Sequence, residues 1–573
     1  MSAAALREFD LANPEEQAPA VDAILGANPF VGISTRDVLA SLGQFVRNVA
    51  AHPDEFRSRM SGYLFDLMEV VAGTSEIKPE ANDRRFADPA FAENPFFRRV
   101  MQSYLAWRSA LHSLVGLSTE PAVGDDWKRP AQERFAVTLL TEALAPINTL
   151  LGNPAALKRA FDTAGRSLVE GFRNQLNDLF TNGGMPSQVD KRPFEVGRNL
   201  AVTPGAVVHR GELCELLQYQ PATAQVYERP LMLVPPEINK FYVMDLAPKR
   251  SLTEYAVAHG LQFFTVSWRN PGPEDRKMGL DDYVNACKEA SAIVSAVTGS
   301  PDINLMGVCA GGITSSLLLG HLAATGDRRI NAATLVVTML DSSEPSMTGM
   351  FANEASVARA IEDSRRKGVL DAGSLARTFA WMRPNDLVWH YWINNYLMGL
   401  DPAPFDILFW NADSTNLPAK LHAGFLDLML HNPLIKADAM KALGTPINLR
   451  DVDCDMYVLA GQTDHICPWR ACYRASRLFG GRTEFVLSGS GHVQSLVCPP
   501  ANFKAKYFTN HNAGSDPEAW LKGGTEHKGT WWDNWIEWIE KRSGDKRPAP
   551  TALGGGGYEA IEPAPGRYVH QQV

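Results

Sequence analysis

The sequence predicts an α/β protein with a mostly helical N-terminal domain, residues 1–195, and a second domain, residues 196–573, built on a parallel sheet. In the first region apolar residues recur at helical spacing, for example across residues 37–51. From about residue 196, short apolar runs alternate with helical segments, which is the pattern of a parallel sheet covered by helices. The alternation stops over residues 342–449, and we expect this long insertion to form a helical cap.

The elements of the second domain follow from these runs. Helices are expected at residues 252–259 and 280–297. Strands are expected at the apolar runs 231–234, 262–268, the run that begins at Ile303, 332–341, 454–460 and 483–487. Beyond residue 550 glycine and proline predict an irregular chain. Large aromatic side chains dominate burial, so we expect the tryptophans near the C-terminus to anchor packing rather than to form a ligand cage; they are Trp520, Trp531, Trp532, Trp535 and Trp538.

Charge and cysteine content exclude several classes of protein. The chain has 573 residues and a net charge of −9, which argues against a general nucleic-acid binder. Its seven cysteines form no C-x-x-C pair, which indicates a reducing cytoplasm and neither a disulfide framework nor a zinc site. We find no secretory signal and no run of about 18 uncharged apolar residues, so no transmembrane segment is expected.

The centre of the predicted sheet is the stretch Ile303–Gly312, where an apolar run ends in Gly-x-Cys-x-Gly around Cys309. A strand, a sharp turn and a helix in this order predict the nucleophile elbow of the α/β-hydrolase fold, with cysteine in the usual place of serine. Side chains at Gly307 and Gly311 would collide with the neighbouring strand and helix in so sharp a turn. The thiol would lie at a helix N-terminus, which favours a thiolate. The alternative interpretation is a buried structural cysteine.

The ends of the last two predicted strands supply an acid and a base. Asp464 follows one predicted strand and His492 follows the next. The order Cys309, Asp464, His492 is that of α/β-hydrolase triads, and the carboxyl ends of parallel strands meet at one edge of a sheet. A helix N-cap role for Asp464 and a plain loop role for His492 are the alternatives. His465 is a rival base, but it adjoins Asp464 and adjacent side chains at a strand end diverge, so we favour His492.

A cysteine nucleophile indicates which reaction the site performs. Attack by serine on a thioester would give an oxygen ester and lose the activation of the acyl group. Attack by Cys309 would give another thioester, from which the acyl group can still pass to an alcohol. The sequence therefore favours acyl transfer from a thioester over ester hydrolysis, and a cap that excludes water would support the same choice.

Motifs along nearly the whole chain resemble those of one family. They are Pro235–Tyr242, Ser267–Pro271, Gly307–Gly312, Phe409–Pro418, Asp464–Trp469, Ser490–Gln494 and Glu562–Val569. These segments resemble the polyhydroxyalkanoate synthases of the single-subunit class I or class II type. Asn182–Ser187 and Leu417–His422 are more similar to class II, the medium-chain type.

The resemblance implies a polyester synthase that polymerises (R)-3-hydroxyacyl-CoA and releases CoA at the surface of cytoplasmic granules, as a homodimer. It implies that Cys309 carries the acyl chain, that His492 and Asp464 activate thiol and hydroxyl, and that no cofactor or metal is needed. Backbone N–H groups of Ala310 and, by family analogy, Ile238 would stabilise the oxyanion. The alternatives are an acyl-CoA thioesterase of the same fold, which would release free 3-hydroxy acid, and a non-catalytic granule-associated protein.

Overall fold

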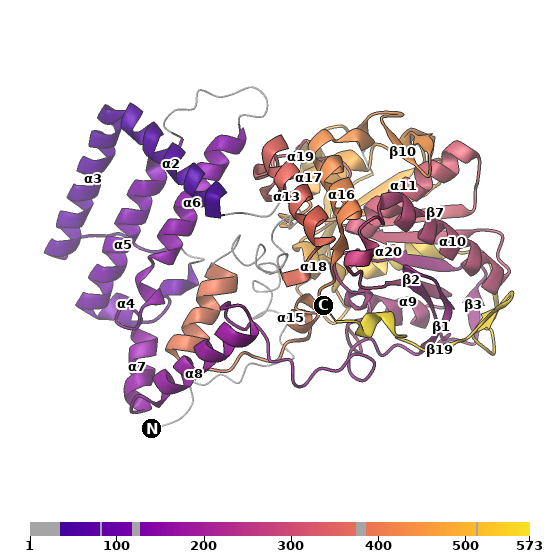
Figure 1. Cartoon of the computed structure of the whole chain (residues 1–573), viewed down its shortest axis with the longest axis horizontal. Helices are drawn as coiled ribbons and strands as arrows, with labels where there is room; N and C mark the ends of the chain where they lie inside the picture. Colours follow the sequence, from indigo (N-terminus) through magenta and orange to yellow (C-terminus); the bar gives the residue numbers. More distant parts are fainter. Residues whose placement is uncertain (1–34, 81–82, 117–126, 374–384, 512–513, 573) are drawn as a thin grey trace. The chain divides into compact units, whose positions relative to one another are not determined.

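The computed structural model describes residues 35–80, 83–116, 127–373, 385–511 and 514–572 (Figure 1). The chain divides into two compact units, which we describe separately. The sheet unit comprises residues 191–376 and 405–573. The helical unit comprises residues 32–190 and 377–404.

The sheet unit contains an eleven-stranded sheet whose six central strands are parallel. In spatial order these six are β13 (Thr483–Ser488), β12 (Asp455–Gly461), β7 (Ile330–Val336), β6 (Ile303–Val308), β4 (Leu231–Val234) and β5 (Phe263–Trp268). Antiparallel strands extend both edges. They are β14 (Lys506–Thr509) and β15 (Thr525–Lys528) beyond β13, and β2 (Cys214–Tyr219), β1 (Gly205–Arg210) and β19 (Glu562–Pro563) beyond β5. The predicted α/β architecture is confirmed.

Helices cover the sheet and bury its apolar strands. The main ones are α9 (Leu252–Ala258), α10 (Leu280–Thr298), α11 (Ala310–Thr325), α17 (Trp469–Ala475) and α20 (Trp531–Glu540). Helix α11 packs on β6, β4 and β7 and is buried along most of its length. The strand predicted at 332–341 is shorter than expected, because Val337 has a φ of 45° and ends the extended conformation after Val336.

The C-terminal tryptophans anchor packing, as expected. All five are buried, and on α20 the indole N–H of Trp535 donates to Thr334 Oγ1 of β7 at 3.1 Å. The prediction of an irregular chain after residue 550 was wrong in part. β19 pairs with β1 through Ala206 and Val207, so the tail completes one edge of the sheet. A further short hairpin joins β17 (Gly554–Gly555) and β18 (Tyr558–Glu559).

The helical unit confirms the helical character predicted for the N-terminal region. Its helices are α2 (Thr35–Ala51), α3 (Pro53–Ala72), α4 (Ala90–Glu93), α5 (Pro95–Ser113), α6 (Lys128–Ala143), α7 (Pro154–Asp162) and α8 (Arg166–Thr181). Helices α3, α5 and α6 run side by side (Figure 1). Two Asn-Pro pairs begin helices: the side chains of Asn94 and Asn153 accept N–H bonds from Phe96 and Ala156, with proline at the first helical position.

The insertion at 342–449 contributes to both units, and its residues 374–384 lie outside the described residues. In the sheet unit α13 (Glu354–Lys367) packs on α16 (Ala419–His431). Two short antiparallel pairs add strands that the sequence did not predict: β8 (Val369–Leu370) with β9 (Leu417–Pro418), and β10 (Met440–Ala442) with β11 (Thr445–Ile447). Residues 377–404 belong to the helical unit, where the indole N–H of Trp392 donates to Asn148 O and the Tyr396 hydroxyl donates to Asp178.

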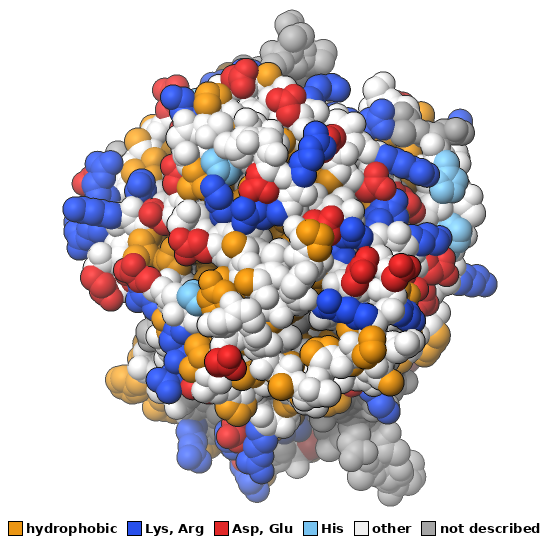
Figure 2. All heavy atoms as spheres, turned by 90° about the vertical axis from the view of Figure 1, so that its right-hand side faces the viewer, with side chains coloured by type: hydrophobic (Ala, Val, Ile, Leu, Met, Phe, Trp, Pro, Cys, Tyr) orange, Lys and Arg blue, Asp and Glu red, His pale blue; other side chains and the backbone are white. Residues whose placement is uncertain are grey.

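The two units differ in their surfaces. Twenty large hydrophobic side chains are exposed among the described residues, and seventeen of them belong to the helical unit. Helices α3 and α8 carry many of these: Leu64, Phe65, Met68, Val71, Val169, Phe172, Leu176, Leu179 and Phe180. On the face of the molecule shown in Figure 2, basic and acidic side chains intermingle and hydrophobic ones occur singly or in small groups.

Candidate active site

The predicted nucleophile elbow is present between β6 and α11. Cys309 has φ 52° and ψ −119°, a strained conformation for a residue with a side chain. A Cβ at Gly307 would lie 2.6 Å from Ser315 Oγ, and one at Gly311 would collide with the carbonyl oxygens of Val234 and Pro235. The collisions predicted from the sequence are therefore real. They explain why glycine stands on either side of the Cys309 turn.

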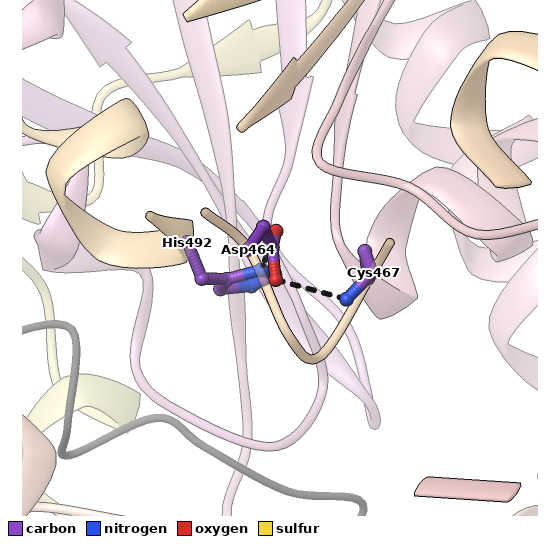
Figure 3. Close-up of side chains that lie close together, drawn as sticks. All are labelled: Asp464, Cys467 and His492. Atoms are coloured by element: carbon purple, nitrogen blue, oxygen red, sulfur yellow. Dashed lines mark hydrogen bonds and ion pairs between the residues drawn. The ribbon is translucent and has the colours of Figure 1, made fainter. Parts of the chain in front are cut away.

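Asp464 and His492 lie together at the same edge of the sheet. Asp464 follows β12, and His492 begins α18 (His492–Leu496) after β13. The ring Nδ1 of His492 donates to Asp464 Oδ2 at 2.6 Å (Figure 3). The other carboxylate oxygen, Oδ1, accepts the backbone N–H groups of Ile466 at 2.8 Å and Cys467 at 2.9 Å. Both side chains are buried, so this arrangement fixes the orientation of the imidazole.

The sulfur of Cys309 is half-buried, and it interacts electrostatically with His492 and Asp464. The side chain of Cys467 and the positive charge of His492 hold the pKa of the Cys309 thiol well below its usual range, although burial opposes this. Burial disfavours a charged imidazole, but Asp464 and the Cys309 sulfur raise the pKa of His492 well above its ordinary value. Both pKa shifts favour a negative charge on the Cys309 sulfur and a positive charge on the His492 ring.

Asp464, Cys467 and His492 also have the residue types of a metal site, with ligand atoms within 4.8 Å of one another. Their contacts favour a hydrogen-bonded arrangement instead. The 2.6 Å separation of His492 and Asp464 is a hydrogen bond, and both carboxylate oxygens already accept N–H donors. The donor atoms of His492 and Asp464 therefore point at each other and not at a common centre.

The two residues predicted as oxyanion donors lie on different elements. Ala310 begins α11, and Ile238 lies in the loop that follows β4. Within the described residues neither backbone N–H donates to a protein acceptor. The carbonyl of Ile238 is held in place, because it accepts the N–H of Thr415 at 3.1 Å and its hydroxyl at 2.8 Å.

The loop that contains Ile238 is fixed by a buried ion pair. Lys240 Nζ lies 2.8 Å from Asp413 Oδ1, and both side chains are buried. Lys240 also donates to the carbonyls of Val569 and Gln571 at the C-terminus, at 2.7 and 2.9 Å. Three of the motifs quoted above thus meet in one network. The sequence supplied the motifs but not this connection between them.

Glu237 and Cys467 are two further residues near Cys309 to which the sequence analysis assigned no role. The carboxyl of Glu237 is buried and accepts from Thr314 Oγ1 at 2.6 Å, while its Oε2 has no hydrogen-bond partner. Burial raises the pKa of Glu237 to about 7. Cys467 comes three residues after Asp464 in the same turn. That spacing is the only sequence signal that could have placed Cys467 at the site.

Comparisons with known proteins identify the family and support the fold. A family model described as the N-terminus of poly-beta-hydroxybutyrate polymerase (PhaC) matches residues 82–256, and one described as the alpha/beta hydrolase fold matches residues 244–498. The chain is 47% identical to poly(3-hydroxyalkanoate) polymerase 1 of Ectopseudomonas oleovorans over 98% of this chain and 99% of that protein. This chain belongs to the poly(3-hydroxyalkanoate) polymerase family.

Other members of the family match over similar lengths. Polymerase 2 of the same organism is 46% identical, over 95% of this chain and 96% of its own. The polymerase subunit PhaC of Cupriavidus necator is 38% identical, over 94% of this chain and 91% of its own. The higher similarity to the two Ectopseudomonas proteins fits the class II type. The polymerase is an acyltransferase with an α/β-hydrolase domain, as predicted, and its activity implies a hydroxyacyl-CoA substrate and a polyester product.

A membrane-spanning helix was not expected for this polymerase. Among the helices of the described residues, none combines the length and the apolar character needed to cross a bilayer.

Proposed function

We propose that this polymerase builds its polyester through a covalent thioester on Cys309, with His492 as the acid–base group and Asp464 as its orienting partner. The single observation that carries the proposal is the buried contact of His492 Nδ1 with Asp464 Oδ2, at the sheet edge where the Cys309 elbow lies. This contact leaves the second ring nitrogen of His492 for proton exchange with sulfur or substrate.

The first step is acylation. The Cys309 thiolate attacks the thioester carbonyl of (R)-3-hydroxyacyl-CoA, and the N–H groups of Ala310 and Ile238 stabilise the resulting oxyanion. When the tetrahedral intermediate collapses, the bond to the CoA sulfur breaks. The imidazolium of His492 gives its proton to the departing CoA thiolate, which leaves as free CoA.

The second step forms the ester bond. The 3-hydroxyl of another hydroxyacyl unit gives its proton to the neutral His492, and its oxygen attacks the thioester on Cys309. Collapse releases the Cys309 thiolate, beside the imidazolium that has just formed, and the chain is one unit longer. We propose no cofactor or metal for this cycle, because CoA enters and leaves with the substrate.

We also propose that the polymerase works at the surface of cytoplasmic polyester granules. The exposed apolar side chains of α8 support this, because Val169, Phe172, Leu176 and Leu179 recur at helical spacing and form an apolar stripe. A polyester surface would bury this stripe. The resemblance to the family further leads us to propose a homodimer, which the molar mass in solution would test.

Replacement of the nucleophile tests the covalent mechanism. We expect Cys309→Ala to reduce CoA release from (R)-3-hydroxyacyl-CoA by roughly 10⁴-fold or more, since the other members of a triad cannot replace its nucleophile. Cys454→Ala is the matched control, because Cys454 is also half-buried but lies directly before β12, and we expect normal turnover. Substantial turnover by Cys309→Ala would refute the proposal. Free 3-hydroxy acid in place of polymer from the wild-type protein would indicate a thioesterase.

A further inference from the structure

The carboxyl of Glu237 joins the loop after β4 to the helix that follows Cys309. Within that helix, α11, the hydroxyl of Ser316 donates back to the carbonyl of Gly312 at 2.7 Å, as serine and threonine commonly do in helices. Thr314 is fully buried in the same helix, five residues after Cys309. Its hydroxyl instead donates out of the helix, to Glu237 Oε1 at 2.6 Å. This bond therefore connects two separate elements of the site.

The same loop also lies in close contact with the first turn of α11. A Cβ at Gly311 would lie 2.4 Å from the carbonyl oxygen of Pro235, so there is no room between the two backbones. On its other side the loop is held by the cap insertion, because Thr415 Oγ1 donates to the backbone carbonyl of Glu237 at 2.8 Å. The bond to Thr314 adds a fixed point on the side of the nucleophile helix.

Stability does not explain why a carboxyl occupies this place. Glu237 is 3% exposed, and among the described residues its Oε2 atom has no hydrogen-bond partner. Burial of a carboxyl with one oxygen unpaired costs free energy, and an apolar side chain of similar volume would avoid that cost. The cost points to a task for Glu237 at the site.

We propose that Glu237 is a positioning residue of the polymerase, whose hydrogen bond with Thr314 holds the loop of Ile238 in place against the helix that follows Cys309. The inference rests on the proposed function, because it takes Cys309 as the nucleophile and the backbone N–H of Ile238 as an oxyanion donor. Such a donor stabilises the transition state only from the correct position, and a displacement of about 1 Å can cost about 100-fold in rate.

Loss of the bond should affect some steps and leave others unchanged. Acylation and ester formation both pass through a tetrahedral oxyanion, so a displaced donor should slow both. Substrate binding involves no oxyanion, so KM should stay the same while kcat falls. Alkylation of Cys309 by iodoacetamide also forms no oxyanion, because the thiolate displaces iodide from a saturated carbon. The alkylation rate therefore reports on the thiol alone.

Four variants remove or keep this bond. Thr314→Val has nearly the volume of threonine but no hydroxyl, whereas Thr314→Ser keeps the hydroxyl. Glu237→Leu removes the acceptor, whereas Glu237→Gln keeps an acceptor oxygen. Ser316→Ala is the matched control, because it removes a buried hydroxyl of the same helix that donates within the helix and not to the loop.

The test measures kcat and KM for CoA release from (R)-3-hydroxydecanoyl-CoA, and the alkylation rate of Cys309 by mass spectrometry of its peptide, in the full-length protein. We expect Thr314→Val and Glu237→Leu to lower kcat by about 10- to 100-fold. Their KM and alkylation rates should stay within about twofold of the wild type. Thr314→Ser, Glu237→Gln and Ser316→Ala should behave as the wild type does.

The double variant that combines Thr314→Val with Glu237→Leu gives a further check. If the two side chains act through one shared bond, the second substitution removes nothing that the first has left. The double variant should therefore lose about as much kcat as the slower single variant, and not the product of the two losses. Multiplied losses would overturn the inference, because the two residues would then act independently.

The other outcomes separate this inference from the proposed function. A wild-type kcat in Thr314→Val would overturn the inference, and this variant decides the question even if Glu237→Leu does not fold. An alkylation rate that falls as far as kcat would also overturn it, because the bond would then hold the thiol and not the loop. So would a Thr314→Ser variant as slow as Thr314→Val, or an equal loss in Ser316→Ala, since packing would explain the effect. CoA release by Cys309→Ala would instead refute the proposed function, whatever the Thr314 variants show.

Discussion

The sheet unit and the helical unit stabilise themselves in different ways. The sheet unit buries its strands and the helix after Cys309, and it also buries ionisable side chains such as Lys240, Asp413 and Glu237. The helical unit leaves many large apolar side chains exposed, and its ion pair between Lys158 and Asp162 lies in solvent. The difference indicates two tasks: the first unit holds reacting groups in fixed positions, and the second offers an apolar surface.

Removal of the cation from one ion pair should destabilise the sheet unit far more than the helical unit, and this is the largest effect that we expect. In the sheet unit, Lys240→Met leaves the Asp413 carboxylate buried without its cation, and we expect a loss of about 3–5 kcal/mol in the free energy of unfolding. In the helical unit, Lys158→Met breaks an ion pair whose side chains are 75% and 52% exposed. We expect it to cost about 0–1 kcal/mol.

Denaturant titrations of both variants, followed by tryptophan fluorescence, measure these losses. The Lys240 variant should also lose polymerase activity, because Lys240 fixes the loop of Ile238. Equal losses in the two variants would contradict the contrast between the units.

The buried carboxyl of Glu237 should give a smaller effect that depends on pH. Its folded pKa of about 7 lies above the usual 4.5, so the folded protein holds this proton more tightly than the unfolded chain does. The resulting cost to stability begins as pH rises above 4.5 and is complete above pH 7. Glu237→Gln removes the ionisation, and we expect it to stabilise the protein by about 3 kcal/mol at pH 8 and to have no effect near pH 4.5.

Glu170→Gln on α8 is the control from the helical unit, since Glu170 pairs with Arg166 at the surface. Its effect should stay within about 1 kcal/mol at every pH. A Glu237→Gln variant whose stability gain does not grow between pH 5 and pH 8 would show that this carboxyl is not kept neutral by burial.

Substitutions on α8 should have the smallest effect on stability and the clearest effect on binding to polyester granules. Phe172→Asp with Leu176→Asp places charges on side chains that are 60% and 40% exposed. The free energy of unfolding should change by no more than about 0.5 kcal/mol for such surface positions. Binding to amorphous polyester granules should weaken by about 100-fold or more, because two apolar side chains can no longer be buried.

Co-sedimentation with granules measures this binding. Gln175→Asp with Asn177→Asp adds the same charge to exposed polar positions of the same helix, and we expect it to bind nearly as the wild type does. If both double variants lose binding equally, charge repulsion explains the result and the apolar stripe does not.

The sequence predicted the centre of the sheet unit well, because local rules determine it. The clashes at Gly307 and Gly311 are imposed by the turn itself, and strand ends of a parallel sheet must meet at one edge, so Asp464 and His492 could be brought together without coordinates. The features that the sequence did not predict depend on contacts between segments that are distant along the chain. The pairing of β19 with β1, the bond of Trp392 to Asn148, and the burial of Glu237 have no local signal.

The proposed thioester is tested most directly by mass spectrometry of the enzyme after rapid mixing with (R)-3-hydroxydecanoyl-CoA and an acid quench. The account predicts one or more hydroxyacyl units on the peptide that contains Cys309, and none on the peptide that contains Cys467. Acylation of another residue, or rapid CoA release with no acylated peptide at any time, would contradict it.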